Sequence, residues 1–237
     1  MLSVVNYNIK YGKRLSEIAP WISSLPEKLD IMCFQEFPIK HLSILFDALP
    51  KNTYDYKFAS GFIKRGTDYG QLTVFNTQKV QYKSHKVSTY PGSFFEKRIF
   101  RNKGERSSLI TTFLYGKKQF RIANTHLVCL ALNRQRRKQL ITIQETLSQM
   151  PHAKKMPTII LGDLNYTSLI GQNAFITFME KYGFQNAIRG VRTHRLFLVP
   201  HQLDYVFYNN CSISDISVVK TNMSDHYPLF FTLILEK

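Results

Sequence analysis

The sequence predicts an α/β protein in which two β-sheets pack face to face and helices cover their outer surfaces. Short runs of β-branched and aromatic residues recur along the whole chain. Only a few amphipathic helical stripes lie between them. Because the strand-like runs greatly outnumber the helices, two stacked sheets with helices outside account for the pattern most economically.

Each predicted strand is a short run of residues that suit a pleated sheet. Several runs are apolar on both faces, which is typical of central strands in packed sheets. In chain order they are LSVVNYNI, DIMCFQEF, QLTVFN, SSLITTFLY, FRIANTHLV, PTIILGD, LDYVFY and PLFFTLIL.

Four helices are predicted where apolar residues recur three and four positions apart. They cover residues 15–25, 39–49, 133–149 and 173–182. Pro20 interrupts the first helix, and Gly183 follows the last as a C-terminal stop. Since no repeat or linker divides the chain, we expect residues 1–237 to form a single domain.

The composition indicates a globular, strongly basic chain. Lys and Arg number 32 against 16 for Asp and Glu, which gives a net charge of +16. No apolar run approaches the roughly 20 residues of a membrane-spanning helix. Nucleic acid and an anionic membrane are the natural partners of such a charge, and charge alone does not separate them.

The cysteines and the N-terminus bear on the compartment. Cys33, Cys129 and Cys211 fit neither a zinc pattern nor a disulfide framework, so we expect buried free thiols in a reducing environment. The N-terminus shows no export signal. A cytoplasmic location is therefore expected, unless processing has removed a leader.

Polar side chains interrupt apolar strand faces where strands end. Asn8 and Glu36 each lie at the C-terminal end of a predicted strand, on a face that is otherwise apolar. Burying a carboxylate is costly unless it is paired or binds a cation. Glu36 is therefore either a salt-bridge partner or a ligand of a hard metal.

The same arrangement recurs at four further strand ends, two of which carry a pair of polar residues. Six such strand ends are hard to explain as scattered accidents, so we expect one converging site at one edge of the sheets. The additional residues are His126, Asp163, Asn165, Asp204, Asp225 and His226.

The residue types at these ends favour one kind of chemistry. Carboxylate and amide oxygens suit Mg²⁺, Mn²⁺ or Ca²⁺. The sequence lacks the zinc motif H-E-x-x-H, the phosphate-binding P-loop and the G-x-S-x-G nucleophile turn. Metal-assisted attack by water remains, with a histidine as general base and an aspartate to orient it.

The motifs that carry these residues resemble those of the endonuclease/exonuclease/phosphatase (DNase I-like) superfamily. They run in the family's order from residue 6 to residue 229 and read NYNIKYG, FQEF, NTHL, GDLN, LDYVF and SDHYPL. The resemblance implies a four-layer α/β sandwich with two stacked mixed β-sheets flanked by helices. It also implies a phosphodiester hydrolase that uses Mg²⁺, with Mn²⁺ as the alternative cofactor.

The resemblance also implies which residues form the metal site. Asn8, Glu36 and Asp225 match the family's metal-site positions. Lys10 stands where abasic-site endonucleases carry an aspartate, which argues against that subclass.

The remaining motif residues match positions that act on the phosphate. By resemblance, Asp163 and Asn165 position the water and hold the phosphate. His226 faces the reacting phosphate with Asp204 behind it, and His126 binds or protonates a phosphate oxygen.

Two basic segments are candidate substrate contacts. In the segment FFEKRIFRNKGER, residues 94–106, Arg98, Arg101 and Arg106 would meet phosphates while the aromatic rings stack on bases. The alternative is a basic surface hairpin with its aromatic rings in the core. Arg134 is a candidate phosphate clamp or part of a solvated helical face.

The predicted function is a monomeric, metal-dependent nuclease, with DNA favoured as substrate. The alternative is a phospholipid or inositol phosphate phosphodiesterase or phosphatase at an anionic membrane, although the sequence shows no apolar loop or lipidation motif that favours it. A third hypothesis is a binding module that lost the chemistry. It is disfavoured because every expected site position carries a competent residue.

Overall fold

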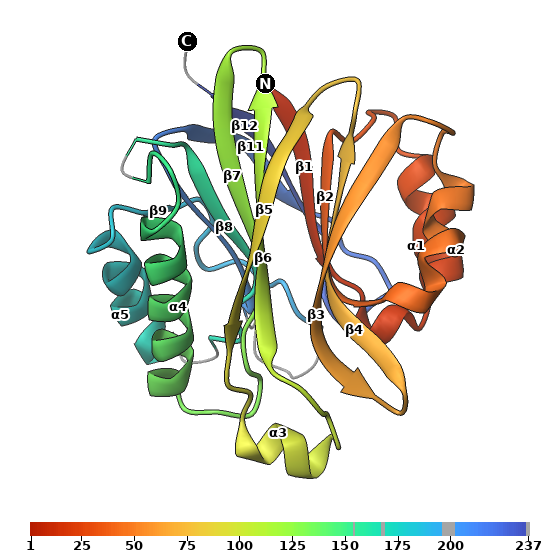
Figure 1. The fold of residues 1–237 in the computed structure, drawn as a ribbon. Helices are drawn as coiled ribbons and strands as arrows, with labels where there is room; N and C mark the ends of the chain where they lie inside the picture. The colour runs from red at the N-terminus through yellow and green to blue at the C-terminus, as the bar shows by residue number, and fades with distance from the viewer. Residues whose placement is uncertain (154, 167–168, 196–201, 236–237) are drawn as a thin grey trace.

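The computed structural model describes residues 1–153, 155–166, 169–195 and 202–235. The chain forms two six-stranded mixed sheets with helices on their outer faces. Figure 1 shows α1 and α2 on one side of the stacked sheets, and α4 and α5 on the other. This arrangement confirms the predicted four-layer α/β sandwich.

The first sheet has the strand order β11-β12-β1-β2-β4-β3. β1 and β2 run parallel, and every other neighbouring pair is antiparallel. The strands are β1 (Leu2–Asn8), β2 (Ile31–Pro38), β3 (Tyr54–Lys64), β4 (Thr67–Asn76), β11 (Ser212–Val218) and β12 (Leu229–Ile234).

The second sheet has the order β5-β6-β7-β8-β10-β9. It also contains one parallel pair, formed by β7 and β8. The strands are β5 (Gln81–Tyr90), β6 (Arg106–Tyr115), β7 (Lys118–His126), β8 (Thr158–Asp163), β9 (Gln185–Asn186) and β10 (Asp204–Asn209).

The helices differ from the prediction mainly at their ends and in one addition. The expected helix over 39–49 divides into a 3₁₀ turn and α2, and the last helix starts earlier than expected. No described helix is long and apolar enough to cross a membrane. The helical elements are η1 (Lys10–Gly12), α1 (Leu15–Ser23), η2 (Ile39–His41), α2 (Leu42–Ala48), α3 (Phe94–Ile99), α4 (Asn133–Ser148) and α5 (Leu169–Glu180).

Three apolar layers hold the sandwich together. Between the sheets, side chains such as Phe231 and Ile122 are almost fully buried. Outside the first sheet, Ile18 of α1 belongs to a second cluster. Outside the second sheet, Leu140 of α4 and Phe175 of α5 pack in a third. Burial of these faces explains why the helices lie where they do.

Two expectations are wrong. Only Cys33 is a buried thiol, since Cys129 is exposed and Cys211 is half-buried, although none of the three forms a disulfide. The segment 94–106 is not a hairpin with its aromatic rings in the core, because it forms α3 and leaves Phe94 and Phe95 exposed.

Candidate active site

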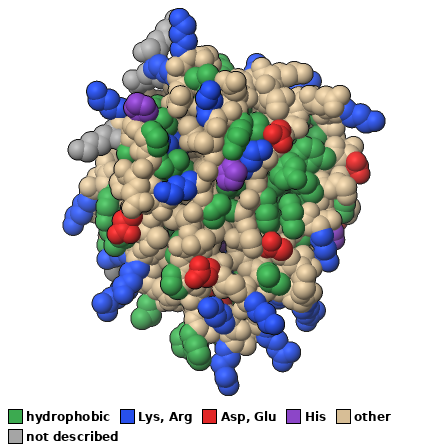
Figure 2. Space-filling model, viewed as in Figure 1, with side chains coloured by type: hydrophobic (Ala, Val, Ile, Leu, Met, Phe, Trp, Pro, Cys, Tyr) green, Lys and Arg blue, Asp and Glu red, His purple; other side chains and the backbone are tan. Residues whose placement is uncertain are grey.

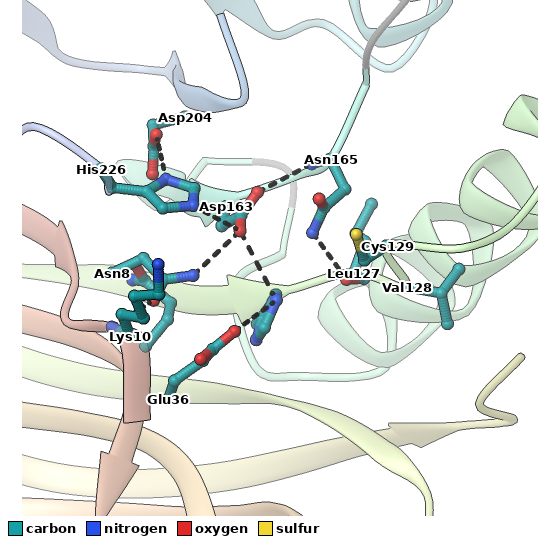
Figure 3. Close-up of polar contacts among 12 residues, drawn as sticks. Asn8, Lys10, Glu36, Leu127, Val128, Cys129, Asp163, Asn165, Asp204 and His226 are labelled. Atoms are coloured by element: carbon teal, nitrogen blue, oxygen red, sulfur yellow. Dashed lines mark hydrogen bonds and ion pairs between the residues drawn. The ribbon is translucent and has the colours of Figure 1, made fainter. Parts of the chain in front are cut away.

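The site lies where the two parallel strand pairs end. Asn8 and Glu36 lie near the ends of β1 and β2, and His126 and Asp163 end β7 and β8. Because parallel strands bring their carboxyl ends to one edge, each sheet contributes two polar residues. A cavity of about 680 Å³ opens there, and His226 also lines it. Figure 3 shows the side chains of Asn8 and His226 pointing toward Asp163, with Glu36 on the same side of the site as Asn8.

A β-bulge aims Glu36 into this cavity. The pairing of β2 with β4 shifts register between Phe34 and Phe37. Glu36 has a φ of 55°, a left-handed conformation that is uncommon for a residue other than glycine. The bulge breaks the alternation of the strand and re-aims the side chain. The backbone N–H of Tyr11 then donates to Glu36 Oε2 over 3.1 Å.

Asp163 occupies the centre because β8 approaches β7 unusually closely. A Cβ atom on Gly162, whose φ is +134°, would lie 1.9 Å from the carbonyl oxygen of Thr125. Asp163 Oδ2 accepts a hydrogen bond from Asn8 Nδ2 over 2.9 Å, and Oδ1 accepts one from the Asn165 backbone over 3.0 Å. Burial raises the pKa of Asp163 to about 7.

In its neutral form, His226 carries its proton on Nδ1. Its Nδ1 lies 2.8 Å from Asp204 Oδ2, and because a carboxylate accepts, Nδ1 donates. Nε2 is left to face the cavity, 3.5 Å from Asp163 Oδ2. Burial by itself would lower the pKa of His226, but Asp204 and Asp163 raise it to about 10. Thr193 Oγ1 accepts from the backbone N–H of Asp204 and so fixes the start of β10.

His126 has the opposite tautomer. Its Nδ1 lies 3.1 Å from Arg106 Nη1, and because a guanidinium only donates, Nδ1 accepts and Nε2 carries the hydrogen. This Nε2 lies 3.5 Å from Asp163 Oδ2 and 3.8 Å from Glu36 Oε1. Burial and the charge of Arg106 hold the pKa of His126 well below its usual value. The ring is therefore a neutral donor.

Arg106 is held in place by a buried ion pair. Arg106 Nη2 lies 3.0 Å from Glu96 Oε1, and Nε donates to Glu96 Oε2 over 3.2 Å. Both side chains are almost fully buried. Arg106 lines the cavity, but its guanidinium is engaged with Glu96 and His126.

Lys10 contacts two of the predicted metal residues. The backbone N–H of Lys10 donates to Asn8 Oδ1 over 3.0 Å, and Lys10 Nζ lies 2.7 Å from Asp225 Oδ2. Burial would raise the pKa of Asp225, but the hydrogen bond from Lys10 and the charge of His226 bring it below its usual value. Burial raises the pKa of Glu36, and Arg106 only partly offsets it.

These oxygens fit a divalent cation. Glu36, Asp225 and the amide oxygen of Asn8 are hard donors of the kind that Mg²⁺ and Mn²⁺ prefer. Glu36 is a largely buried carboxylate whose pKa is raised. The backbone N–H of Tyr11 donates to it, and the neutral ring of His126 lies 3.8 Å from it. A bound cation would supply the positive charge that stabilises the ionised Glu36 carboxylate in its largely buried position.

A search of known proteins agrees with the motif order. The model of the endonuclease/exonuclease/phosphatase family matches residues 5–226. The chain belongs to this family. A UPF0294 protein of Erwinia tasmaniensis is 33% identical over 126 residues, which are 52% of this chain and 45% of that protein. The match thus spans about half the length of this curated relative.

Solved structures share the family fold at low identity. An endonuclease/exonuclease/phosphatase from Bacteroides vulgatus is 18% identical, covers 99% of both chains and has a TM-score of 0.78. A mannosyl-6-phosphatase of Bacteroides thetaiotaomicron is 18% identical, covers 99% of this chain and 100% of its own, and has a TM-score of 0.71. These likenesses show the fold alone.

The structure brings the predicted strand-end residues of this family member to one place, together with one of the four predicted arginines, Arg106. Arg98, Arg101 and Arg134 are exposed and do not line the cavity. The segment 94–106 thus contributes Arg106 and Phe100 to the cavity wall.

Sequence reasoning missed His194 as part of the site. Its ring packs edge-on against His226, with centroids 4.6 Å apart, and a β-bridge joins the two residues. Ligand atoms of His194, Asp225 and His226 lie within 4.8 Å of one another. No strand pattern marks the segment around His194, so only the bridge to residue 226 reveals its place.

A buried polar layer beneath the site joins the two sheets. Gln35 Nε2 donates to Asn6 Oδ1 over 2.8 Å within the first sheet, and to Asn124 Oδ1 of the second sheet over 2.7 Å. Asn124 Nδ2 donates in turn to the carbonyl oxygen of Phe34 over 3.1 Å. These bonds cross the sandwich and fix the distance between the strand ends that carry the site.

Proposed function

We propose that this chain is a divalent-metal-dependent phosphodiester hydrolase that uses water as its nucleophile. The main support is the pair of imidazoles in opposite tautomers on either side of Asp163. In its neutral form His226 presents Nε2 as a proton acceptor, and His126 presents Nε2–H as a donor. Hydrolysis of a phosphodiester needs both a base for water and a donor for the developing oxyanion.

The chain's own groups divide the reaction between them. Asp163 Oδ2 and His226 Nε2 lie 3.5 Å apart and together orient the attacking water. His226 Nε2 accepts the proton of that water, and Asp204 stabilises the imidazolium that results. His126 Nε2–H donates to a non-bridging phosphoryl oxygen. Asn165 is fixed in place because its side-chain Nδ2 donates a hydrogen bond to the carbonyl oxygen of Leu127.

The remaining site residues would bind the divalent cation that the reaction uses. Asn8, Glu36 and Asp225 would bind Mg²⁺, or Mn²⁺ as the alternative. When bound, the cation supplies positive charge for the phosphoryl oxygens and offsets the carboxylates that raise the pKa of His226.

Nucleic acid, with DNA first, is the substrate class that we propose. The net charge of +16 supports it, because neutralising phosphates releases counterions from nucleic acid. A phospholipid is the second candidate. The supporting observation is that Phe94 and Phe95 of α3 are exposed, a feature of membrane-active surfaces that nucleic acid binding does not require.

Hydrolysis of a panel of substrates tests the proposal. The purified protein would be assayed with bis(p-nitrophenyl) phosphate, plasmid DNA, single-stranded DNA, RNA and phospholipid vesicles, in Mg²⁺, Mn²⁺ or EDTA. We expect metal-dependent cleavage that His226→Ala abolishes and that His85→Ala, on the exposed edge strand β5, leaves unchanged. Absence of metal-dependent cleavage across the panel would sink the proposal.

A further inference from the structure

A group of large apolar side chains stands exposed on and beside α3. We call Phe94, Phe95, Ile99 and Leu132 the apolar patch; they are 71%, 60%, 61% and 81% exposed. Apart from Met1, no other large hydrophobic residue in the described part of the chain is more than 44% exposed. Clusters of this kind on a protein surface mark contacts with apolar partners.

The polarity of α3 is reversed relative to an ordinary surface helix, which faces its apolar side to the core. Its single acid, Glu96, is buried and holds Arg106. Glu96 Oε1 also accepts from the backbone N–H of Cys129 over 2.5 Å. Ser93 caps the helix by accepting from the N–H of Phe95 and donates to the carbonyl oxygen of Leu130. Because Glu96 and Ser93 attach the polar side of α3 to the rest of the protein, its apolar side faces the solvent.

Cations surround the apolar patch. Figure 2 shows hydrophobic groups among Lys and Arg side chains at the lower end of the view, where Figure 1 places α3. Glu105 is the only exposed acid between residues 94 and 106. Phe95 and Leu132 line one shallow groove with two of the cations. The exposed cations of α3, of the segment after it and of the first turns of α4 are Lys97, Arg98, Arg101, Lys103, Arg134 and Lys138.

We propose that the apolar patch and its ring of cations dock the protein on an anionic phospholipid bilayer. Exposed rings and aliphatic chains would insert at the headgroup boundary while the cations meet lipid phosphates. Nucleic acid fits less well, because Ile99 and Leu132 offer no ring on which a base can stack. Figure 1 also shows α3 at the lower end of the molecule, beyond the ends of the sheets, where it can meet a flat bilayer.

Docking in this orientation brings the cavity to the bilayer surface. Phe100, the residue after α3, lines the cavity. Arg106 contacts Glu96 of α3 on one side and His126 on the other. The same buried ion pair therefore fixes both the docking helix and a site imidazole. The inference goes beyond the proposed function, since membrane binding does not depend on hydrolysis.

Vesicle sedimentation in EDTA, where no metal-dependent turnover occurs, tests the proposal. The wild-type protein should bind phosphatidylcholine vesicles containing phosphatidylserine at least 10-fold more tightly than pure phosphatidylcholine vesicles. A triple variant, Phe94→Ser, Ile99→Ser, Leu132→Ser, should lose at least 10-fold in vesicle affinity. The variant Tyr182→Ser, which removes an exposed ring from the end of α5, should bind as the wild type does.

Two further measurements make the result specific. The triple variant should hydrolyse bis(p-nitrophenyl) phosphate at the wild-type rate, which shows that the fold and the site are intact. Single-stranded DNA affinity, measured in the same buffer, should change less than threefold. Equal vesicle binding by wild type and triple variant would overturn the proposal. So would a triple variant that loses DNA affinity but keeps its vesicle affinity.

Discussion

Replacing Asp204 by Asn tests whether this carboxylate sets the proton position on His226. Asp204 is 1% exposed, and its Oδ2 lies 2.8 Å from His226 Nδ1. At an effective dielectric constant of about 20, two unit charges at that distance attract by about 6 kcal/mol. This corresponds to about four pKa units. Burial opposes the attraction, and the resulting pKa of His226 is about 10.

The amide of Asp204→Asn keeps the shape of the side chain and removes its charge. We expect the pKa of His226 in the metal-free protein to fall by about two units or more. The sign follows from the lost anion, which stabilises only the protonated ring. We expect kcat to fall by about 10²- to 10⁴-fold, because the ring loses its fixed tautomer and its support as imidazolium.

Two assays check these expectations. NMR titration of the histidine C–H signals in EDTA gives the pKa of His226, with His226→Ala to assign the signal. Steady-state hydrolysis of bis(p-nitrophenyl) phosphate gives kcat. Asp215→Asn, at an exposed position of β11, is the matched control and should alter neither quantity. An Asp204→Asn protein with kcat within threefold of the wild type would refute the assigned role.

Three further changes probe the packing and the charges of the site. Gly162→Ala places a Cβ atom 1.9 Å from the backbone of β7, so urea denaturation should show a loss of about 3 kcal/mol or more; an unchanged midpoint would contradict the close approach. Arg106→Met leaves the Glu96 carboxylate buried without its cation and should cost about 3–5 kcal/mol, and adding Glu96→Gln should recover much of it; equal stability of single and double variants would argue against the pair. Lys10→Met frees Asp225 from its ammonium and should tighten Mn²⁺ binding about two- to fivefold by calorimetry; weaker binding would show that Lys10 supports the metal site.

The sequence predicted the central strands and missed the edges. The eight predicted runs correspond to β1, β2, β4, β6, β7, β8, β10 and β12. The four strands it did not predict, β3, β5, β9 and β11, are the edge strands of the two sheets. An edge strand buries little of its surface, as the mostly exposed β5 shows. Its polar, charged sequence protects the edge and lacks the apolar run on which the prediction relied.

The same reliance on apolar periodicity explains why the hairpin alternative for residues 94–106 was wrong. Periodicity assigns apolar side chains to the core, and that alternative placed these rings in the interior. In α3 the acid is buried and two phenylalanines are exposed. The reversal depends on Arg106, which lies ten residues after Glu96 and donates a hydrogen bond to its carboxylate. No local pattern contains that contact.

The two site histidines show where sequence reasoning about chemistry stops. Both lie beside polar residues in a strand-end motif, and the residues of the motifs do not by themselves say which ring accepts a proton and which donates one; only the family resemblance assigned those roles. In the structure, the group that contacts Nδ1 distinguishes the roles of the two rings. His226 faces Asp204, 22 positions earlier, and His126 faces Arg106, 20 positions earlier.

An acceptor at Nδ1 leaves Nε2 of His226 free to take a proton, while a donor at Nδ1 obliges Nε2 of His126 to carry one. The difference between base and donor therefore depends on two partners of opposite charge, Asp204 at the start of β10 and Arg106 at the start of β6. Exchanging those charges would exchange the roles of the rings, although both histidines would keep their places at the site.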